Sequence, residues 1–423
     1  MASRWQRRIF LTVMVLAGCA LAWQIAARAL AHAYAETDPG LALSLKADNP
    51  QAQLNVANRL VTSKPGSSNP GAAEKATRRL MTTAPLQSGA LRDLGIVADA
   101  NGQEGRAQAI MGRAGARGFR DNRVQVWLFQ QALSRHDSGE TFLRMDAVLR
   151  TNPDLDARMF PWLASLLNDP GNIGPLSRRL AADPSWRESA LIYLSTHAQD
   201  FHPVANLFDA LVKLGRGPTD HEAEALLGRM AKEGRYEEAY LLWVSYLPPR
   251  ALGDLGDLYD GAFQGLPGSP PFNWGLFRAP GRTVAIAKPT PSAKYALHIE
   301  YPVETSLELA EQILVLPAGS YRLSGQFMVS RPAAGAHLQW TVICAISGAT
   351  LAATRESGDS ASGWRPFSVD FEVPDDCTAQ RLRLVGLPGD EFGDLSAWYG
   401  DLAIQPGSPR NPASAGAPAD VER

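Results

Sequence analysis

Residues 319–329 read Gly-Ser-Tyr-Arg-Leu-Ser-Gly-Gln-Phe-Met-Val, and this stretch decides the fold of the C-terminal part of the chain. Its apolar and small residues recur at every second position, which places them on one face of a β-strand. Similar runs lie on both sides of it, separated by Pro and Gly clusters at 266–271, 288–292 and 317–319. Six or more such runs predict an antiparallel β-sandwich, or jelly roll, over residues 251–405. The side chains predicted to face its interior are those of Tyr295, Leu297, Ile299, Tyr301, Tyr321, Leu323, Gly325, Phe327, Val329, Leu338, Trp340, Val342, Cys344, Phe367, Val369, Phe371, Val373, Leu382, Leu384, Trp398, Gly400, Leu402 and Ile404.

Residues 36–250 lack this alternation and read as helices. They are rich in Ala, Leu and Arg, with apolar residues at helical spacing and short breaks at Gly, Asn and Pro. A shift of 34 residues aligns Leu60 with Leu94 and Leu128, and this is the period of the tetratricopeptide repeat. The stretch Leu91-x-x-Leu94-Gly95-x-x-Ala98 resembles one degenerate copy. We expect an α-solenoid whose concave surface docks a protein partner; the alternative is a spacer, or a lid on the C-terminal domain.

The N-terminus is basic and then apolar. Arg4, Arg7 and Arg8 lie in a segment at 1–8, and the apolar stretch at 9–31 is long enough to span a bilayer as a signal-anchor. The arginines predict a cytoplasmic N-terminus and a periplasmic bulk at a bacterial inner membrane. Leu16-Ala17-Gly18-Cys19 also resembles a lipobox, so lipidation of Cys19 is one alternative and ordinary signal cleavage is another.

Composition limits the function classes. The net charge is −2, which argues against a nucleic-acid binder with a basic face. The 423 residues exceed what one core normally organises, so separate folded units are expected. Outside the apolar stretch there are two cysteines, Cys344 and Cys377, and in an oxidising compartment they predict a disulfide; the alternative is two buried thiols.

The sandwich region resembles a known class of modules. Leu258-Tyr259-Asp260-Gly261-x-Phe263, followed by Pro271-Phe272-x-Trp274, is similar to the opening of galactose-binding-like jelly rolls, notably family 4 and 9 carbohydrate-binding modules. The run from Gln312 to Leu323 and the closing Asp401-Leu402-x-Ile404 resemble the same modules. This resemblance implies a jelly roll and a glycan ligand. It also implies that Asp260 and Asp401 could hold a structural calcium ion, although Gln264 stands where many members have glutamate.

Aromatic side chains are the candidates for glycan contact, because protein modules commonly hold a sugar by stacking a ring on its apolar face. Trp364 and Tyr301 are expected at strand ends and are the leading candidates, with Tyr399 and Trp274 as further ones. Trp340 and Trp398 are expected in the core.

Catalytic motifs are missing from the sequence: we find no Ser-His-Asp elbow, metal-binding helix, phosphate loop or Cys-x-x-Cys. A glycosidase needs two facing carboxylates, for which Glu300, Glu356 and Asp370 could be nominated, but their spacing carries no signal. We therefore predict a non-catalytic, membrane-anchored periplasmic scaffold without a resident cofactor, which docks a protein partner and binds glycan in surface-polysaccharide assembly or export. The alternatives are a purely structural protein–protein adaptor and an accessory subunit of a polysaccharide-modifying enzyme. The Pro- and Ala-rich tail at 406–423 is expected to be disordered.

Overall fold

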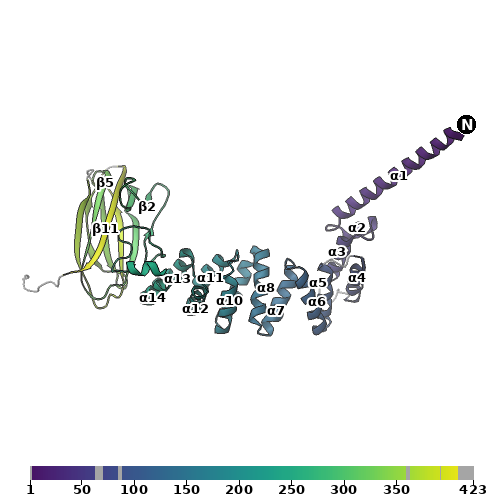
Figure 1. The fold of residues 1–423 in the computed structure, drawn as a ribbon, viewed down its shortest axis with the longest axis horizontal. Helices are drawn as coiled ribbons and strands as arrows, with labels where there is room; N and C mark the ends of the chain where they lie inside the picture. Colours follow the sequence, from purple (N-terminus) through teal and green to yellow (C-terminus); the bar gives the residue numbers. More distant parts are fainter. Residues whose placement is uncertain (1, 62–69, 84–87, 359–362, 391, 408–423) are drawn as a thin grey trace, which may run out of the picture. The chain divides into compact units, whose positions relative to one another are not determined.

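The computed structural model describes residues 2–61, 70–83, 88–358, 363–390 and 392–407 (Figure 1). Helices come first and strands follow, as the sequence predicts. The change from helix to strand falls between Asp254 and Gly275. The predicted disordered tail lies, from residue 408 onward, outside the described residues.

The helices are mostly three to four turns long. Their bounds are α1 Ala2–Ala33, α2 Pro39–Leu45, α3 Pro50–Val61, α4 Pro70–Thr83, α5 Ser88–Ala100, α6 Glu104–Arg117, α7 Asn122–Ser134, α8 Ser138–Thr151, α9 Asp156–Leu167, α10 Ile173–Leu180, α11 Arg187–His197, α12 His202–Lys213, α13 Asp220–Lys232 and α14 Tyr236–Tyr246, with short 3-10 turns at Pro153–Leu155, Pro170–Asn172 and Pro249–Asp254.

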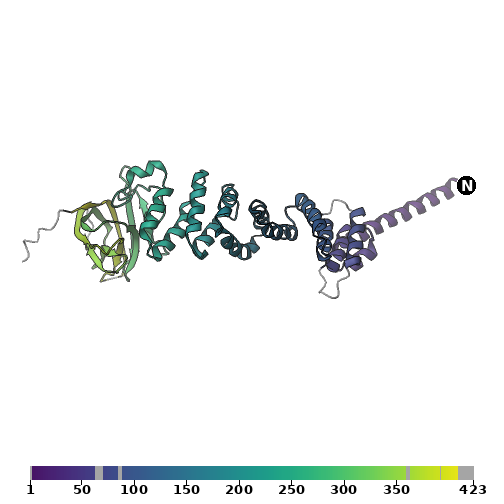
Figure 2. The ribbon, with the colours of Figure 1, turned by 90° about the horizontal axis from the view of Figure 1, so that it is seen from below.

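The chain divides into two compact units. One comprises Met1–Pro161 with Ala182–Trp186, and the other comprises Trp162–Ala181 with Arg187–Arg423, so the second unit contains the last helices and both sheets. Within the first unit successive helices pack in pairs (Figure 2). A Cβ at Gly95 would lie 2.8 Å from the side chain of Met111, so glycine is what lets α5 and α6 approach this closely.

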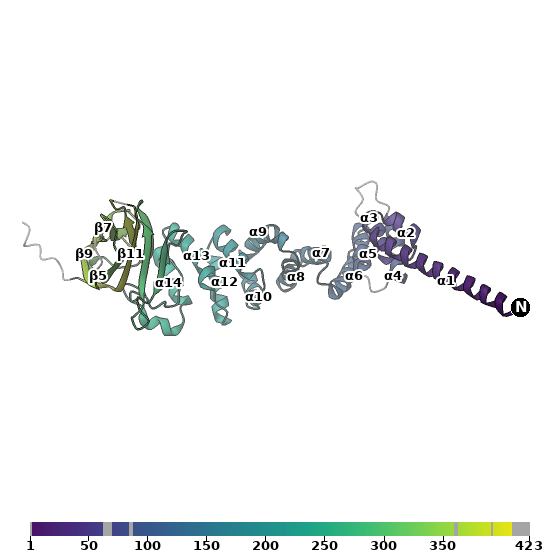
Figure 3. The same cartoon turned by 90° about the horizontal axis from the view of Figure 1, so that it is seen from above.

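The helix α1 stands out by its length and composition. Its segment Ile9–Ala33 is apolar and long enough to cross a membrane, although a signal sequence has the same character. It projects from α2 and α3 (Figure 3). The end of α1 nevertheless belongs to the folded unit, because Ala31 of its last turn and Ala35, just after it, are fully buried in a cluster with Ala42 of α2 and Ala52 of α3.

The strands form two antiparallel sheets that face each other as a sandwich. One sheet has the order β1-β4-β10-β6-β7, with β8 also paired to β6, and the other has the order β2-β3-β11-β5-β9. The bounds are β1 Gly275–Leu276, β2 Thr283–Ala287, β3 Ala296–Pro302, β4 Leu307–Leu314, β5 Gly319–Arg331, β6 His337–Cys344, β7 Thr350–Ala353, β8 Glu356–Ser357, β9 Arg365–Val373, β10 Gln380–Leu387 and β11 Asp394–Pro406. Trp340 is fully buried between the sheets, as predicted.

Three residues predicted to face the interior do not: Tyr295, Trp398 and Gly400. A bulge in β11 between Gly400 and Ala403 shifts its register against β5, so the inward positions are Ala397 and Tyr399 before the bulge, and Leu402 and Ile404 after it. Trp398 therefore lies on the outer face, half-buried against His298. Tyr295 precedes the first residue of β3 and is 47% exposed.

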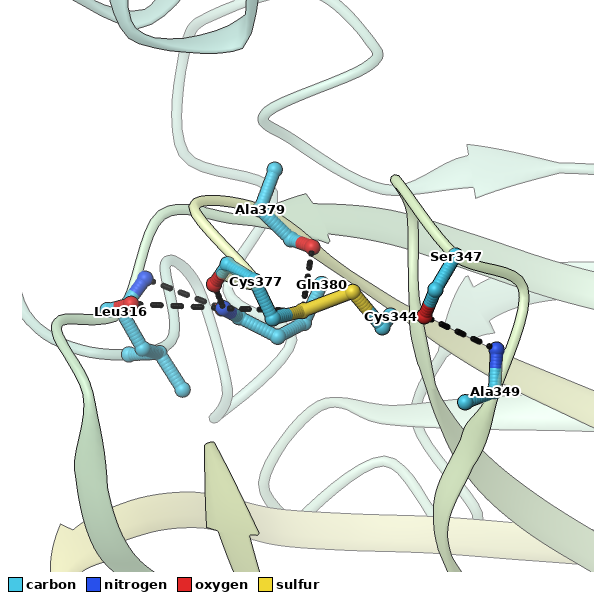
Figure 4. Close-up of a disulfide and its surroundings, with 7 residues drawn as sticks. All are labelled: Leu316, Cys344, Ser347, Ala349, Cys377, Ala379 and Gln380. Atoms are coloured by element: carbon cyan, nitrogen blue, oxygen red, sulfur yellow. Dashed lines mark hydrogen bonds between the residues drawn. A yellow bond between two sulfur atoms is a disulfide. The ribbon is translucent and has the colours of Figure 1, made fainter. Parts of the chain in front are cut away.

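The predicted disulfide between Cys344 and Cys377 is confirmed (Figure 4). It ties the end of β6 to the turn before β10, and both residues are buried. Beside it the Gln380 amide accepts from the backbone N–H of Leu316 at 3.0 Å and donates to the carbonyl of Cys377 at 2.8 Å. This buried amide therefore provides hydrogen-bond partners for backbone groups of Leu316 and Cys377, which are distant in the sequence.

Helix α14 packs on one end of the sandwich through aromatic rings. Trp243 is 1% exposed, and its ring meets that of Tyr259 edge-on at 4.9 Å and that of Phe272 at 5.8 Å. The segments that carry Tyr259 and Phe272 lead directly into the first strand of the sandwich. The last helix and the sandwich thus share one aromatic core.

Candidate functional site

The candidate site is a hollow of about 180 Å³ on the outer face of the five-stranded sheet. It lies where the segment before β3, the middle of β5, the start of β9 and the bulge of β11 meet. The residues that line it include Lys294, Tyr295, Gln326, Trp364, Gly400 and Asp401.

Two exposed aromatic rings line this hollow. Trp364 is 41% exposed and Tyr295 is 47% exposed. An added Cβ at Gly400 would lie 3.4 Å from a ring carbon of Trp364, so the indole rests against the bare backbone of β11. The Lys288 ammonium lies over the Tyr295 ring, 4.8 Å from the ring centroid.

Polar groups accompany the rings. Lys294 Nζ lies 3.6 Å from Asp401 Oδ1, with the two side chains 86% and 51% exposed, so this ion pair contributes little to stability. The Gln326 side chain is also exposed. An amide, a carboxylate and an ammonium can donate to or accept from hydroxyl groups, while the rings offer apolar faces. This combination matches the chemistry of a pyranose ring, which has an apolar face and a hydroxyl rim.

The outer face continues beyond the hollow along β3 and β11. His298 and Trp398 are paired across these strands and stack with ring centroids 4.1 Å apart. The His298 ring nitrogen Nε2 lies 3.1 Å from the Ser396 hydroxyl, and burial lowers the pKa of His298 below its ordinary value. On the same sheet, the Arg331 guanidinium of β5 donates to the Glu300 carboxylate of β3 at 2.5 Å.

The structure separates the predicted glycan contacts into two groups. Trp364 lines the hollow, and its part in glycan binding stays a prediction. Tyr301 and Tyr399 are fully buried and Trp274 is 7% exposed, so Tyr301 is not the exposed platform that was predicted, and the further candidates Tyr399 and Trp274 are buried as well.

Each buried ring has a structural partner that explains its position. The Tyr301 hydroxyl donates to the carbonyls of His337 and Leu387 at 3.2 Å each. The Trp274 indole N–H donates to the Asp260 carbonyl at 3.0 Å. Tyr301 does lie at the end of β3, one residue before its last residue Pro302, as expected, but its side chain points into the core with those of Leu297 and Ile299.

The predicted calcium ligands Asp260 and Asp401 both have protein partners in this structure, and the calcium site stays a prediction. The two carboxylate oxygens of Asp260 accept the backbone N–H groups of Gln264 at 2.6 Å, Gly265 at 2.9 Å and Leu266 at 3.2 Å, so the side chain holds a tight turn. Asp401 faces Lys294. In the part of the chain that the structure describes, no group of three His, Cys, Asp or Glu side chains converges as a metal site would require.

Sequence reasoning missed Tyr295, Trp398 and Gln326. Gln326 sits at an outward position of β5, which alternation does identify, but nothing in the sequence distinguishes it from the other outward residues. Tyr295 and Trp398 were placed in phase with buried neighbours. Only knowledge of where β3 begins, and of the bulge in β11, moves them to the surface.

Comparisons with known proteins give structural neighbours only. No protein-family model and no curated protein matches the chain. A family 61 carbohydrate-binding module solved with β-1,4-galactotriose matches at 15% identity over 35% of this chain and 92% of its own, with a TM-score of 0.25. A family 22 xylan-binding domain from Paenibacillus barcinonensis matches at 16% identity over 31% and 85%, with a TM-score of 0.24. A family 4 module matches at 13% identity over 36% and 99%, with a TM-score of 0.25.

Enzymes are also among the neighbours. An arabinose-bound α-L-arabinofuranosidase matches at 14% identity over 35% of this chain but 26% of its own, with a TM-score of 0.26. Such low identities and scores say nothing about what this chain binds.

Proposed function

We propose that the protein is a non-catalytic, membrane-anchored scaffold of the bacterial envelope that binds a glycan on the outer face of its five-stranded sheet. The observation that carries this proposal is the hollow lined by the exposed rings of Tyr295 and Trp364, by the backbone of Gly400 and by the polar groups of Gln326 and Asp401. Exposing aromatic rings to water is unfavourable in free energy, and two such rings around a hollow are typical of a ligand site.

The remaining parts have assigned roles in this proposal. Helix α1 holds the chain at the inner membrane, and the helices that follow dock a protein partner during polysaccharide assembly or export. This division is supported by the length and composition of Ile9–Ala33 and by the stacked helix pairs of the first unit. A second candidate is a structural adaptor in which the same outer face contacts protein, since Trp364 and Tyr295 also suit a protein interface.

Affinity electrophoresis tests the glycan proposal. The full chain, solubilised in detergent, is run through gels that contain β-1,4-galactan, xylan, hydroxyethylcellulose or a bacterial exopolysaccharide. We expect retardation by at least one polymer, and a loss of affinity of about tenfold or more for Trp364→Ala and for Tyr295→Ala, because each removes a stacking surface at the centre of the site.

The matched control is Phe392→Ala, which removes another aromatic ring of the sandwich that is 91% exposed and does not line the hollow. This variant should be retarded like the wild type. Migration of the wild type unaffected by every polymer, with a protein partner captured through Trp364, would favour the adaptor instead.

A further inference from the structure

A second hollow lies beside the end of α1 and has a different chemistry. It has a volume of about 270 Å³ and is lined by Glu36, Asn55, Asn58, Arg59 and Arg123. Every lining side chain is polar, and two of the five are guanidinium groups. The residues come from the segment after α1, from α3 and from the first turn of α7.

Side chains of α3 fix the position of this hollow relative to α1. The carbonyl groups that follow a helix end have no partner within the helix. Here the Ala35 carbonyl accepts from Asn55 Nδ2 at 2.8 Å, and the carbonyls of Glu36 and Thr37 accept from Arg59 Nη2 at 3.2 Å and 3.1 Å. The hollow therefore cannot move independently of the end of the apolar helix.

The depth of the hollow follows from the length of α1. The apolar segment Ile9–Ala33 has 25 residues, about 38 Å at 1.5 Å per residue, whereas a bilayer hydrocarbon core is about 30 Å thick. Its last turns therefore reach the headgroup layer. Tyr34, which is 41% exposed, follows directly, and tyrosine is typical of this layer.

The charges at the hollow favour an anion. Arg59 and Arg123 together carry two positive charges against the single carboxylate of Glu36. Asp38 and Asp121 do not line the hollow: Asp38 accepts the backbone N–H of Leu41 at 3.0 Å, and Asp121 forms an ion pair with Arg92 at 3.0 Å. The Arg123 side chain is exposed and positioned by a hydrogen bond of 2.8 Å from its Nη1 to Asn58 Oδ1. Guanidinium and amide donors in this arrangement suit a phosphodiester, which carries one negative charge.

We propose that this hollow binds the phosphate group of an anionic lipid headgroup, so that the membrane surface orients the first helices of the unit. The inference rests on the anchoring role of α1 in the proposed function and is independent of glycan binding. A lipid headgroup and soluble phosphate both present a phosphate oxyanion. Because the hollow lies at the headgroup layer, we assign it to a lipid and not to soluble phosphate.

Native mass spectrometry of the full chain in detergent tests the site. Phosphatidylglycerol or phosphatidylcholine is titrated in, and the bound lipid is counted. We expect tighter binding of phosphatidylglycerol, and a loss of this preference of about fivefold in Arg123→Gln. The control is Arg113→Gln, an exposed arginine of α6 that does not line the hollow and should behave like the wild type. Equal binding by Arg123→Gln and the wild type would overturn the proposal.

Two further experiments distinguish failure of the lipid site from failure of the membrane anchor. If sodium phosphate displaces phosphatidylglycerol at concentrations where sodium chloride of equal ionic strength does not, the site belongs to soluble phosphate and the lipid assignment is wrong. Flotation of the full chain with neutral phosphatidylcholine vesicles tests the anchor alone. A chain that floats but shows no Arg123-dependent preference refutes the headgroup site and leaves the anchor intact, whereas a chain that does not float refutes the anchor.

Discussion

The hydroxyl of Tyr399 donates a hydrogen bond to Oε2 of Glu356 at 3.2 Å inside the sandwich. Tyr399 is fully buried and Glu356 is 4% exposed. Gly400, against which the indole of Trp364 rests, is the next residue of β11. The partner of this buried carboxyl group, Tyr399, is thus the direct neighbour in sequence of Gly400, which lines the candidate glycan site.

This carboxyl group makes stability depend on pH. Burial raises the pKa of Glu356 to about 7, from an ordinary value of 4.5. The folded state therefore binds more protons than the unfolded state between these two values, and stability falls as pH rises through this window. The shift corresponds to a loss of about 3 kcal/mol in the free energy of unfolding between pH 4.5 and pH 8.

Glu356→Gln should remove this dependence. We expect urea unfolding of the sandwich, followed by near-UV circular dichroism, to show a midpoint that changes less between pH 5.5 and pH 8 than in the wild type. Glu300→Gln, which changes a partly exposed carboxylate on the outer face, should keep the wild-type profile. An unchanged pH profile in Glu356→Gln would mean that the buried carboxyl group is not the cause.

The aromatic contacts of Trp243 predict that the last helix and the sandwich unfold together. Trp243→Ala should lower the free energy of unfolding by about 3–5 kcal/mol, because it removes a ring that is 1% exposed and packs on Tyr259 and Phe272. Leu241→Ala on the same helix changes a side chain that is 68% exposed and should shift stability by less than about 0.5 kcal/mol.

Thermal unfolding and limited proteolysis measure this coupling. If Trp243→Ala loosened only the helix, proteolysis would cut within α14 while the sandwich kept its melting temperature. Loss of both together is the expected result.

The disulfide predicts a stability that depends on redox conditions. It closes a loop of 33 residues, and chain-entropy models assign such a loop about 3–4 kcal/mol. The double variant Cys344→Ala with Cys377→Ala should therefore unfold at lower urea concentration than the oxidised wild type. Dithiothreitol should destabilise the wild type and leave the double variant unchanged. A wild type that is insensitive to dithiothreitol would mean that the bridge contributes little.

The order of helices and strands could be predicted from the sequence because apolar residues recur with two different periods, one helical and one alternating. Helical spacing covers α3 to α14, and alternation covers the strands, so the class of each region follows from side-chain spacing alone. The disulfide followed from the number of cysteines outside the apolar stretch. These features are local or compositional.

The site could be predicted only in part because its residues depend on long-range register. Alternation placed Trp398 in phase with Leu402 and Ile404, but the extra residue of the β11 bulge turns Trp398 outward. Tyr301 was read as exposed because Pro302 follows it, and it does lie at the end of β3, but alternation with Leu297 and Ile299 places its side chain in the core. A bulge and a strand end are set by partner strands, which a single sequence does not reveal.

The outward position of Trp398 makes a prediction about ligand length. The row of Trp398 and His298 lies two residues from Gly400 along β11, about 7 Å at 3.4 Å per residue, so one further sugar ring could stack there. Trp398→Ala should weaken binding of longer oligosaccharides of the retained polymer by about threefold to tenfold. A disaccharide that fills the Trp364 hollow should bind the variant and the wild type equally, whereas Trp364→Ala should weaken both ligands. Isothermal titration of oligosaccharides of two to six sugars measures this difference. If Trp398→Ala weakened short and long ligands alike, the tryptophan would act by supporting the sheet through His298 and not by contacting sugar.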